Sequence, residues 1–564
     1  MSTYVTYDDG CAIHVDLRGQ RLHAEIDDSA SFWHYRAQRK AEPPAPAQLT
    51  YTAKDITVIP NGTPVPAPLY PSVAAAELAS RYTPAFALLA KGKAFDDRLV
   101  ATIENALHHG VAGRMGRSAL VQTLRARLGT SDSERSAAGL LEAAASFLGN
   151  RQNEEEEARP SLHARRWLAR YQKQRLPPMG IWSSRAELAK IFDHDRVLAM
   201  ELEPPEVATA LATALAGDES ARDAYRLHLD LAARLCGPAV RPSLLGAGAA
   251  HAAVYPSADS AESRLMRELF GVEPVPAGFQ LIPEIIARVR DGRMSLAPRA
   301  QDGWYAHQQH AIAALLDPGS EGLRVGPRYR RELELLFTAL FGMLRETHVK
   351  QLDCGAAGGR PIYVRPRVTV EPLPELYRRV ADAYVFVRQE LARLAGDDLL
   401  QRELVDAEGE TVAEGLDRME SLLRGAWATS CQELGRPEPG HVAERAFFLA
   451  FQQGSASDPD LAADQRMMVP LYYDLGREKF RVLAVLGLET KRLDVSFETR
   501  PNAWAIARDG SRIDPARLLH THTSGTFVAP VTAELDVSRL LNREQFRELC
   551  DREGSVEAIR LALV

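Results

Sequence analysis

Apolar residues recur every three or four positions along two stretches in the middle of the chain, 329–351 and 374–395. This spacing puts the apolar side chains on one face of an α-helix, so each stretch predicts a long helix. The glycines of 355–359 follow a cationic last turn and end the first helix. Pro374 stands at the start of the second helix, where proline costs least. The pattern predicts a helical hairpin at the core of the protein.

The period of the pattern changes twice along the rest of the chain. Residues 1–60 alternate between apolar and polar and carry Asp-Asp-Gly and Arg-Gly-Gln turn signals, which is typical of a three-stranded meander. Residues 72–148 and 161–236 show the helical period. Alternation returns in the C-terminal part and predicts an antiparallel sheet, followed by helices from Asn542 and Val556.

These patterns predict an α+β protein that is predominantly α, with a multi-helix body, a small N-terminal β meander and a C-terminal antiparallel sheet. A length of 564 residues is enough for several domains. We divide the chain into an N-terminal β meander, a helical region, a helical core and a C-terminal antiparallel β region with terminal helices, at 1–65, 66–236, 237–455 and 456–564.

Two serines are followed three residues later by a glutamate, the signature of a capping box at a helix start. They are Ser131 with Glu134 and Ser184 with Glu187. A second local motif, Asp193-His194-Asp195, brackets a histidine with carboxylates on a predicted helix. Consecutive helical residues point in different directions and cannot converge on one ion, so this motif predicts a solvated helix segment.

Composition narrows the class of protein. Hydrophobic residues make up 46% and charged residues 25% of the chain, values typical of a soluble globular protein. A net charge of −7 gives no reason to expect nucleic acid as a partner. Neither a signal peptide nor a membrane-length apolar run is present, and the five cysteines are scattered. We therefore expect a cytoplasmic protein without membrane partners. Abundant Ala and Arg suggest a bacterial origin.

Familiar catalytic motifs are absent, so candidate chemistry must come from residues that are distant in sequence. Arg345, Glu346 and His348 lie at the polar end of the first central helix, and Glu371 lies just before the second. We expect these four side chains to meet at a helix-end cleft, with Glu371 or Glu346 transferring protons. The alternative for Glu371 is that it stabilises the positive end of the second helix.

Two histidine pairs are candidate ligands for a divalent transition metal. His307 and His310 are three residues apart on a predicted helix, and His520 and His522 are two apart between predicted strands. Both spacings can place two imidazoles on one side, and His348 could complete a set. The alternative is that these histidines form ordinary hydrogen bonds, within a helix face or in a loop beside the sheet.

Residues 237–262 are rich in Gly, Pro and small side chains. They predict either a domain boundary or an irregular loop that enters a pocket, since long loops in compact domains are often functional.

The segment around the second central helix resembles the hallmark of a large uncharacterised bacterial family, a domain of unknown function. The resemblance rests on a Tyr-Val-Glu-Pro box followed by Pro-Glu-x-Tyr. The matching residues are Val370, Glu371, Pro372, Pro374, Glu375 and Tyr377, preceded by a looser match at Arg345, Thr347, Lys350 and Gln351. Thr369 replaces the Tyr, and the spacing in the preceding helix is shorter by about one turn. The resemblance implies a fold but no reaction.

Two functions are compatible with these observations. The first is a small-molecule or peptide-modifying enzyme, with or without a metal, whose site lies between the helical core and the C-terminal sheet. The second is a non-catalytic, α-rich binding or scaffolding protein.

Overall fold

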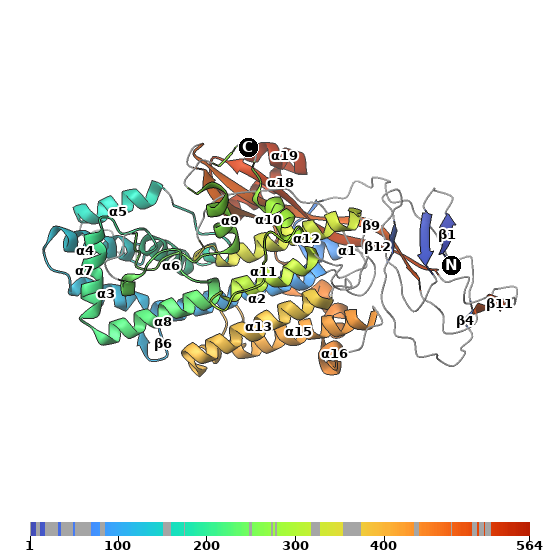
Figure 1. Ribbon diagram of the computed structural model, residues 1–564, viewed down its shortest axis with the longest axis horizontal. Helices are drawn as coiled ribbons and strands as arrows, with labels where there is room; N and C mark the ends of the chain where they lie inside the picture. The colour runs from blue at the N-terminus through green and yellow to red at the C-terminus, as the bar shows by residue number, and fades with distance from the viewer. Residues whose placement is uncertain are drawn as a thin grey trace.

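Figure 1 shows the protein as a computed structural model. The backbone and side chains are described over most of 69–564, and the backbone alone is described in β1 to β4, β10 and β11 and in residues 76–78, 85, 327–333, 432–433, 456, 490–498 and 520–529. The described ranges from β5 onward are 69–78, 85–149, 160–173, 175–246, 251–271, 275–276, 279–316, 327–352, 374–433, 439–474, 477–498, 505–506, 512–513 and 520–564.

Helices form most of the described chain (Figure 1). They are α1 (Val73–Leu78), α2 (Ala85–His109), α3 (Arg117–Ala126), α4 (Asp132–Ala145), α5 (Leu162–Lys173), α6 (Ala186–Leu198), α7 (Pro205–Ala216), α8 (Glu219–Cys236), α9 (Ala261–Phe270), α10 (Leu281–Arg290), α11 (Trp304–Ala313), α12 (Pro327–His348), α13 (Pro374–Ala395), α14 (Asp397–Leu400), α15 (Val412–Glu433), α16 (Val442–Gly454), α17 (Pro459–Ala462), α18 (Arg543–Glu553) and α19 (Val556–Leu563).

The strands lie mostly near the two ends of the sequence. They are β1 (Ser2–Thr6), β2 (Ala12–Asp16), β3 (Phe32–His34), β4 (Leu49–Thr50), β5 (Leu69–Tyr70), β6 (Gly110–Val111), β7 (Arg114–Met115), β8 (Met467–Asp474), β9 (Lys479–Glu498), β10 (Ala505–Ile506), β11 (Arg512–Ile513) and β12 (His520–Val537). The predicted class, α+β and predominantly α, is confirmed.

The C-terminal sheet is built on two long antiparallel strands, β9 and β12. β8 also pairs with β9 in antiparallel fashion, which confirms the predicted sheet. At the N-terminus β1 and β2 form the predicted antiparallel pair. The third strand expected in this meander, at 21–26, lies outside the described residues. β3 instead pairs with β9 in parallel, so residues from the two ends of the chain share one sheet.

The central helices follow the apolar period closely. α12 ends at His348, three residues before the predicted end at 351, and α13 begins at Pro374, as predicted. α11 packs against both of them and against α8. α12 also lies directly on the sheet: a Cβ added to Gly342 would come within 2.6 Å of Cδ2 of Leu483 on β9. The helical hairpin thus joins the helical body to the C-terminal sheet.

Apolar side chains gather in two cores. The larger core takes residues from α2, α11, α12, α13, α15 and the sheet. The second core lies at one end of the molecule, where α3, α4, α5 and α7 gather at the left of Figure 1. α6 and α8 contribute to both, since Phe192 and Leu231 belong to the larger core whereas Val197 and Tyr225 belong to the second. The boundary between the cores therefore runs across these two helices.

One of the two predicted capping boxes is present. Ser131 and Glu134 cap α4 reciprocally, as expected. The prediction for Ser184 is wrong, because Arg185 is the N-cap of α6. A 3₁₀ turn at Gly180–Ser183 precedes this helix, and the Ser184 hydroxyl donates to the Ile181 carbonyl of that turn (2.7 Å).

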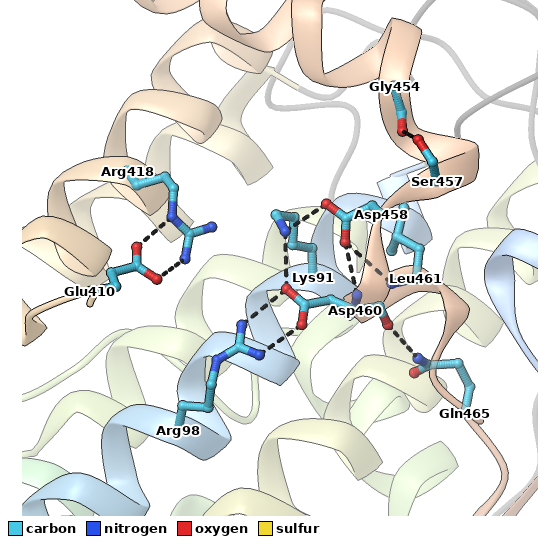
Figure 2. A network of polar contacts seen from close by, with 10 residues as sticks. All are labelled: Lys91, Arg98, Glu410, Arg418, Gly454, Ser457, Asp458, Asp460, Leu461 and Gln465. Carbon is cyan, nitrogen blue, oxygen red and sulfur yellow. Dashed lines mark hydrogen bonds and ion pairs between the residues drawn. The ribbon is translucent and has the colours of Figure 1, made fainter. Parts of the chain in front are cut away.

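A buried ion-pair cluster fixes the segment that leads into the sheet (Figure 2). Lys91 on α2 donates to Asp458 (2.7 Å) and to Asp460 (3.0 Å). Arg98, two helical turns further along α2, forms a bidentate pair with the Asp460 carboxylate (2.7 and 3.0 Å). Because Asp458 also caps the short helix α17, the cluster attaches this turn to the side of α2.

Candidate functional site

A pocket lies where the two cores meet. Its volume is about 220 Å³, and its walls come from α3, α6, α8, the end of α12 and the segment 237–258. The pocket is closed on one side by a backbone contact in which Ala258 N–H donates to the Gln351 carbonyl (2.6 Å). The irregular loop predicted at 237–262 therefore does enter a pocket. The polar or aromatic side chains that line it are Arg117, Asp195, Asp230, Ser243, Tyr255, Ser257, Lys350 and Gln351.

Four buried charges form one wall of the pocket and its immediate support, and we call them the charge cluster: Glu104, Arg117, Asp195 and Lys350. Nη1 of Arg117 lies 2.5 Å from Oε2 of Glu104 and 2.6 Å from Oδ2 of Asp195. Nζ of Lys350 lies 2.6 Å and 2.5 Å from the same two oxygens. Each cation is thus shared by both carboxylates, and the four formal charges cancel.

The two carboxyl groups of the cluster are held in the ionised form. Burial alone would raise the pKa of Asp195, but the charges of Arg117 and Lys350 outweigh it and hold that pKa well below its usual range. The pKa of Glu104 is lowered in the same way, against burial, by Arg117 and Lys350. Proximity to two cations therefore overcomes the cost of burying both charges.

Side chains around the cluster fix its orientation. The Gln351 amide donates to the second oxygen of Glu104. Nδ1 of His194 lies 2.8 Å from the second oxygen of Asp195, so that carboxylate is bound on both oxygens. The Lys350 ammonium also lies 5.2 Å from the centre of the Trp182 ring. These contacts hold the Lys350 side chain in one position beside the pocket.

The prediction that residues 193–195 form a solvated helix segment is wrong. All three side chains are buried. The reason is that α6 lies between the two cores, so other helices cover each of the faces on which these residues lie. Asp193 accepts from the Tyr171 hydroxyl (2.6 Å) and from the Arg175 guanidinium (2.8 and 2.6 Å). Asp195 faces the pocket and His194 lies behind it. The residues do point in different directions, as helical geometry requires.

The predicted catalytic residues Arg345, Glu346 and His348 are buried at the end of α12, but their side chains do not meet. Arg345 pairs with Glu262 and donates to the carbonyls of Pro470 (3.3 Å) and Leu471 (3.2 Å) on β8. These contacts join α12 to α9 and to the sheet. Glu371, the fourth member of the expected cleft, lies outside the described residues.

Glu346 faces a different set of partners. Its carboxylate lies 2.9 Å from Nζ of Lys93 and 2.7 Å from the Arg543 guanidinium of α18. Burial opposes ionisation, but Arg543 and Lys93 outweigh it and lower the pKa of Glu346 to about 2. A carboxylate with that pKa is a weak proton acceptor at neutral pH. In this position Glu346 stabilises the packing of α18 on the helical body.

His348 is the middle of a chain of buried polar groups. Its Nε2 lies 3.0 Å from the Gln308 carbonyl oxygen, and its Nδ1 lies 3.4 Å from the Cys236 sulfur. Burial lowers the pKa of His348 to about 3, so the ring is neutral. The Gln308 amide in turn donates to Asp96 (2.8 Å), which also accepts from the Tyr384 hydroxyl (2.8 Å).

Asp96 borders a second, smaller cavity of about 30 Å³. Its walls are mainly apolar side chains of α2, α11, α12 and α13. Burial raises the pKa of Asp96 to about 8, which the hydrogen bonds from Tyr384 and Gln308 reduce only in part. The volume is enough for one or two water molecules but not for a substrate of ordinary size.

The candidate metal ligands His307 and His310 lie on α11, as predicted. The His307 ring stacks on Phe386 with centroids 4.0 Å apart. Burial lowers the pKa of His307, and burial together with Arg379 lowers that of His310 to about 4. Across the described ranges, no group of three or more His, Cys, Asp or Glu side chains is placed to hold a metal ion. The helical pair therefore has no third ligand there.

His520 and His522 belong to β12, where their backbones pair with Glu498 and Ser496 of β9. The alternative of a loop at these positions is wrong, and the extended chain assumed for a metal-binding pair is confirmed for the backbone. Their side chains lie outside the described part of the structure. The metal hypothesis for this pair stays a prediction.

Sequence reasoning missed Glu104 and Arg117 and interpreted Asp195 as solvated. Lys350 and Gln351 belong to the polar end of the first predicted helix and to the family resemblance, and neither was a predicted site residue. No motif links these residues, and Glu104 and Arg117 lie in predicted helical segments without a distinctive motif. A sequence signal that leads to the site is the Gly- and Pro-rich segment 237–262, several residues of which line the pocket.

Comparisons of this chain with models of protein families, with curated proteins and with solved structures find no match. The family resemblance of the Val-Glu-Pro box stays a prediction.

Proposed function

We propose that this protein is an enzyme that acts on a small molecule bound in the pocket beside the charge cluster. The observation that supports this most is the position of the cluster, three of whose four buried charges line the larger of the two cavities described above. Ligand sites commonly lie where two structural units meet, and this pocket lies between the two cores. A substrate there would contact groups from both.

The cost of burying such a cluster favours a functional role. Replacing buried ion pairs with well-packed apolar residues is often neutral or stabilising, so the cluster does not need to exist for stability. Fixed charges beside a cavity can stabilise charge that develops on a reacting molecule, without reorganisation. We assign Arg117 and Asp195 to contact with the substrate, and Glu104 and His194 to positioning them.

The size of the pocket limits the substrate. At about 220 Å³ it is smaller than most drug-sized sites, and it admits a compact molecule or a single side chain of a peptide. A peptide-modifying enzyme remains compatible with this geometry if one residue of the peptide enters the pocket. A metal cofactor, if one is used, would depend on His520 and His522 and would be separate from the charge cluster.

A second candidate is a protein that binds the small molecule without turnover. One observation favours it: the pKa values of both cluster carboxyl groups are lowered, so neither is matched to proton transfer at neutral pH. The same pocket would then serve recognition only. The two functions differ in whether the bound compound is recovered unchanged.

Incubation with a defined mixture of metabolites, analysed by mass spectrometry, tests the proposal and separates the two candidates. Three proteins are compared: wild type, Ala239→Trp, which fills the pocket mouth, and Ala443→Trp, a matched change at an exposed position on α16. An enzyme consumes one compound and forms a product with wild type and Ala443→Trp but not with Ala239→Trp. A binding protein retains an unchanged compound with the same pattern. Equal behaviour of all three proteins would contradict both.

We also propose that the protein is cytoplasmic. Cys236 and Cys550 are buried free thiols, as is usual in a reducing compartment. Among the helices described here, none combines the length and the apolar character needed to cross a bilayer.

A further inference from the structure

The charges around the pocket leave one carboxylate in excess. The cations of Arg117 and Lys350 are balanced by the carboxylates of Glu104 and Asp195, to which both of them bind. Asp230 also lines the pocket, so the charges around it sum to one negative charge. A monocation restores neutrality there, whereas an anion adds to the excess. The charge balance therefore favours a cationic ligand.

The carboxylate of Asp230 is free to bind a ligand. This residue is exposed, and its side chain has no ion pair or hydrogen bond with any residue that the structure describes. The basic residues one helical turn away on α8 have other partners. Arg226 pairs with Asp223 (2.9 Å), and Arg234 pairs with Glu390 (3.4 Å). Asp230 thus differs from the buried carboxylates of the charge cluster, whose partners lie within the protein.

The geometry of α8 places Asp230 at the rim of the pocket. Asp230, Ala233 and Gly237 all line the pocket, and their spacing of three and four residues puts them on one face of the helix. Along this face Asp230 is exposed, Ala233 is half-buried and Gly237 is buried. The face therefore runs from the solvent at Asp230 into the interior at Gly237, and a ligand can contact the carboxylate with one end while its other end is enclosed.

The neighbouring walls suit an apolar group. They include the side chains of Leu229, Ala232, Pro256 and Ala258. Removal of apolar surface from water stabilises the binding of a hydrocarbon group against such walls. A cavity of about 150 Å³ can hold a benzene ring. The pocket, at about 220 Å³, has room for one ring and a short substituent.

From the charge balance, the free carboxylate at the rim and the apolar walls, we infer that the pocket takes a small protonated amine with an apolar body. The ammonium group donates to the carboxylate of Asp230, and the apolar body lies against the alanine-rich walls. The inference rests on the proposed function for its site, and it adds the chemical class of the substrate.

Three probes of similar shape but different charge test the inference: benzylamine, benzyl alcohol and benzoate. An exposed ion pair gives a modest gain, so we expect benzylamine to bind wild type at least about threefold more tightly than benzyl alcohol. Benzoate, which the carboxylate of Asp230 repels, should bind at least about tenfold more weakly than benzylamine. Dissociation constants come from ligand-observed NMR titration at neutral pH and low salt, with Ala239→Trp as the blocked control. Added salt should weaken the binding of benzylamine and not that of benzyl alcohol, because ions screen an exposed pair.

Variants at Asp230 then test the assigned contact. Asp230→Asn removes the charge and keeps the shape, so benzylamine should bind it no more tightly than benzyl alcohol does. Asp230→Lys reverses the charge and should shift the preference to benzoate. Asp132→Asn, the same change on α4 at a side chain that is 84% exposed and does not line the pocket, should keep the wild-type order. Circular dichroism checks folding, and the ranking of probes on wild type needs no variant.

Each result is decisive. Preference for benzylamine that Asp230→Asn abolishes and Asp132→Asn preserves supports the inference. Equal or tighter binding of benzyl alcohol or benzoate, blocked by Ala239→Trp, overturns the amine inference and leaves the pocket as a small-molecule site. A preference for benzylamine that survives in Asp230→Asn overturns it too. Binding of none of the probes, or binding that Ala239→Trp does not affect, also overturns it, and the proposed function is then judged by the metabolite incubation alone.

Discussion

The ammonium of Lys350 lies 2.5 Å from the carboxylate of Asp195, although 155 residues separate the two in sequence. Lys350 follows the end of α12 and Asp195 lies near the end of α6. Glu104 and Arg117 complete the cluster from α2 and α3. Four helices from both cores must therefore pack correctly before the site exists, so its geometry depends on the whole helical body.

Loss of one cation from the cluster should destabilise the protein strongly. Arg117→Met leaves the carboxylates of Glu104 and Asp195 with one buried cation between them, and the free energy of unfolding should fall by about 3–5 kcal/mol. Arg226→Met is the control, because Arg226 pairs with Asp223 with both side chains about half exposed. It should cost at most about 1 kcal/mol. Urea denaturation measures both, and equal losses would contradict the role given to the cluster.

The ion pairs of Asp460 should protect the folded state against acid. Burial opposes ionisation, but Arg98 and Lys91 outweigh it and lower the pKa of Asp460 from 3.8 to about 2. The unfolded state therefore binds more protons in this interval, so this contribution is complete above pH 3.8 and is lost as the pH falls towards 2. Asp460→Asn should be less stable than wild type at neutral pH and lose less stability between pH 4 and 2. Asp132→Asn, at an exposed carboxylate, should keep the wild-type slope.

Asp96 should change the stability of the protein with pH in the opposite direction to Asp460. Its pKa is about 8 in the folded protein, owing to burial, and 3.8 ordinarily, so the folded state binds more protons between these values. Stability from this group therefore falls as the pH rises from about 4 to about 8. Asp96→Asn has no such proton, and its stability relative to wild type should rise across that range. Thermal unfolding at a series of pH values measures the slope. A variant slope equal to that of wild type would show that Asp96 is ionised when folded.

The histidines of β12 allow a test of the metal hypothesis. Elemental analysis of the untagged protein should find near-stoichiometric Zn, Fe, Mn or Cu in wild type and not in the His520→Ala/His522→Ala double variant. The paired variant His307→Ala/His310→Ala should keep the metal, because this helical pair has no third ligand among the described residues. The hypothesis is rejected if wild type and the His520→Ala/His522→Ala variant are equally folded and neither contains metal.

Local features of the fold could be predicted because local physics determines them. The apolar period of α12 and α13, the proline at the start of α13 and the capping box at Ser131 each act within a few residues. The predicted capping box at Ser184 is absent because the Ser184 hydroxyl bonds to a 3₁₀ turn, and no sequence pattern predicted that turn. The alternation of apolar and polar residues predicted the antiparallel sheet, but it did not predict that β3 pairs with β9 in parallel.

The site could not be predicted in the same way. Asp195 is buried because both cores pack against α6. The charged residues of this helix, taken alone, do not predict that packing. Arg345, Glu346 and His348 look like one cluster in sequence because they are adjacent on a helix. Glu346 faces another side of the helix and pairs with Arg543. Arg345 and His348 are three residues apart and share a face, but they bind different partners, Glu262 and Gln308.

Crystallographic fragment screening of the wild-type protein tests most directly whether this pocket is the functional site. Bound fragments should concentrate in the pocket between α8 and the segment 237–258, in contact with Arg117 or Gln351. Fragments that bind only elsewhere on the protein, with the pocket holding nothing but water in every crystal, would contradict a small-molecule function for the charge cluster.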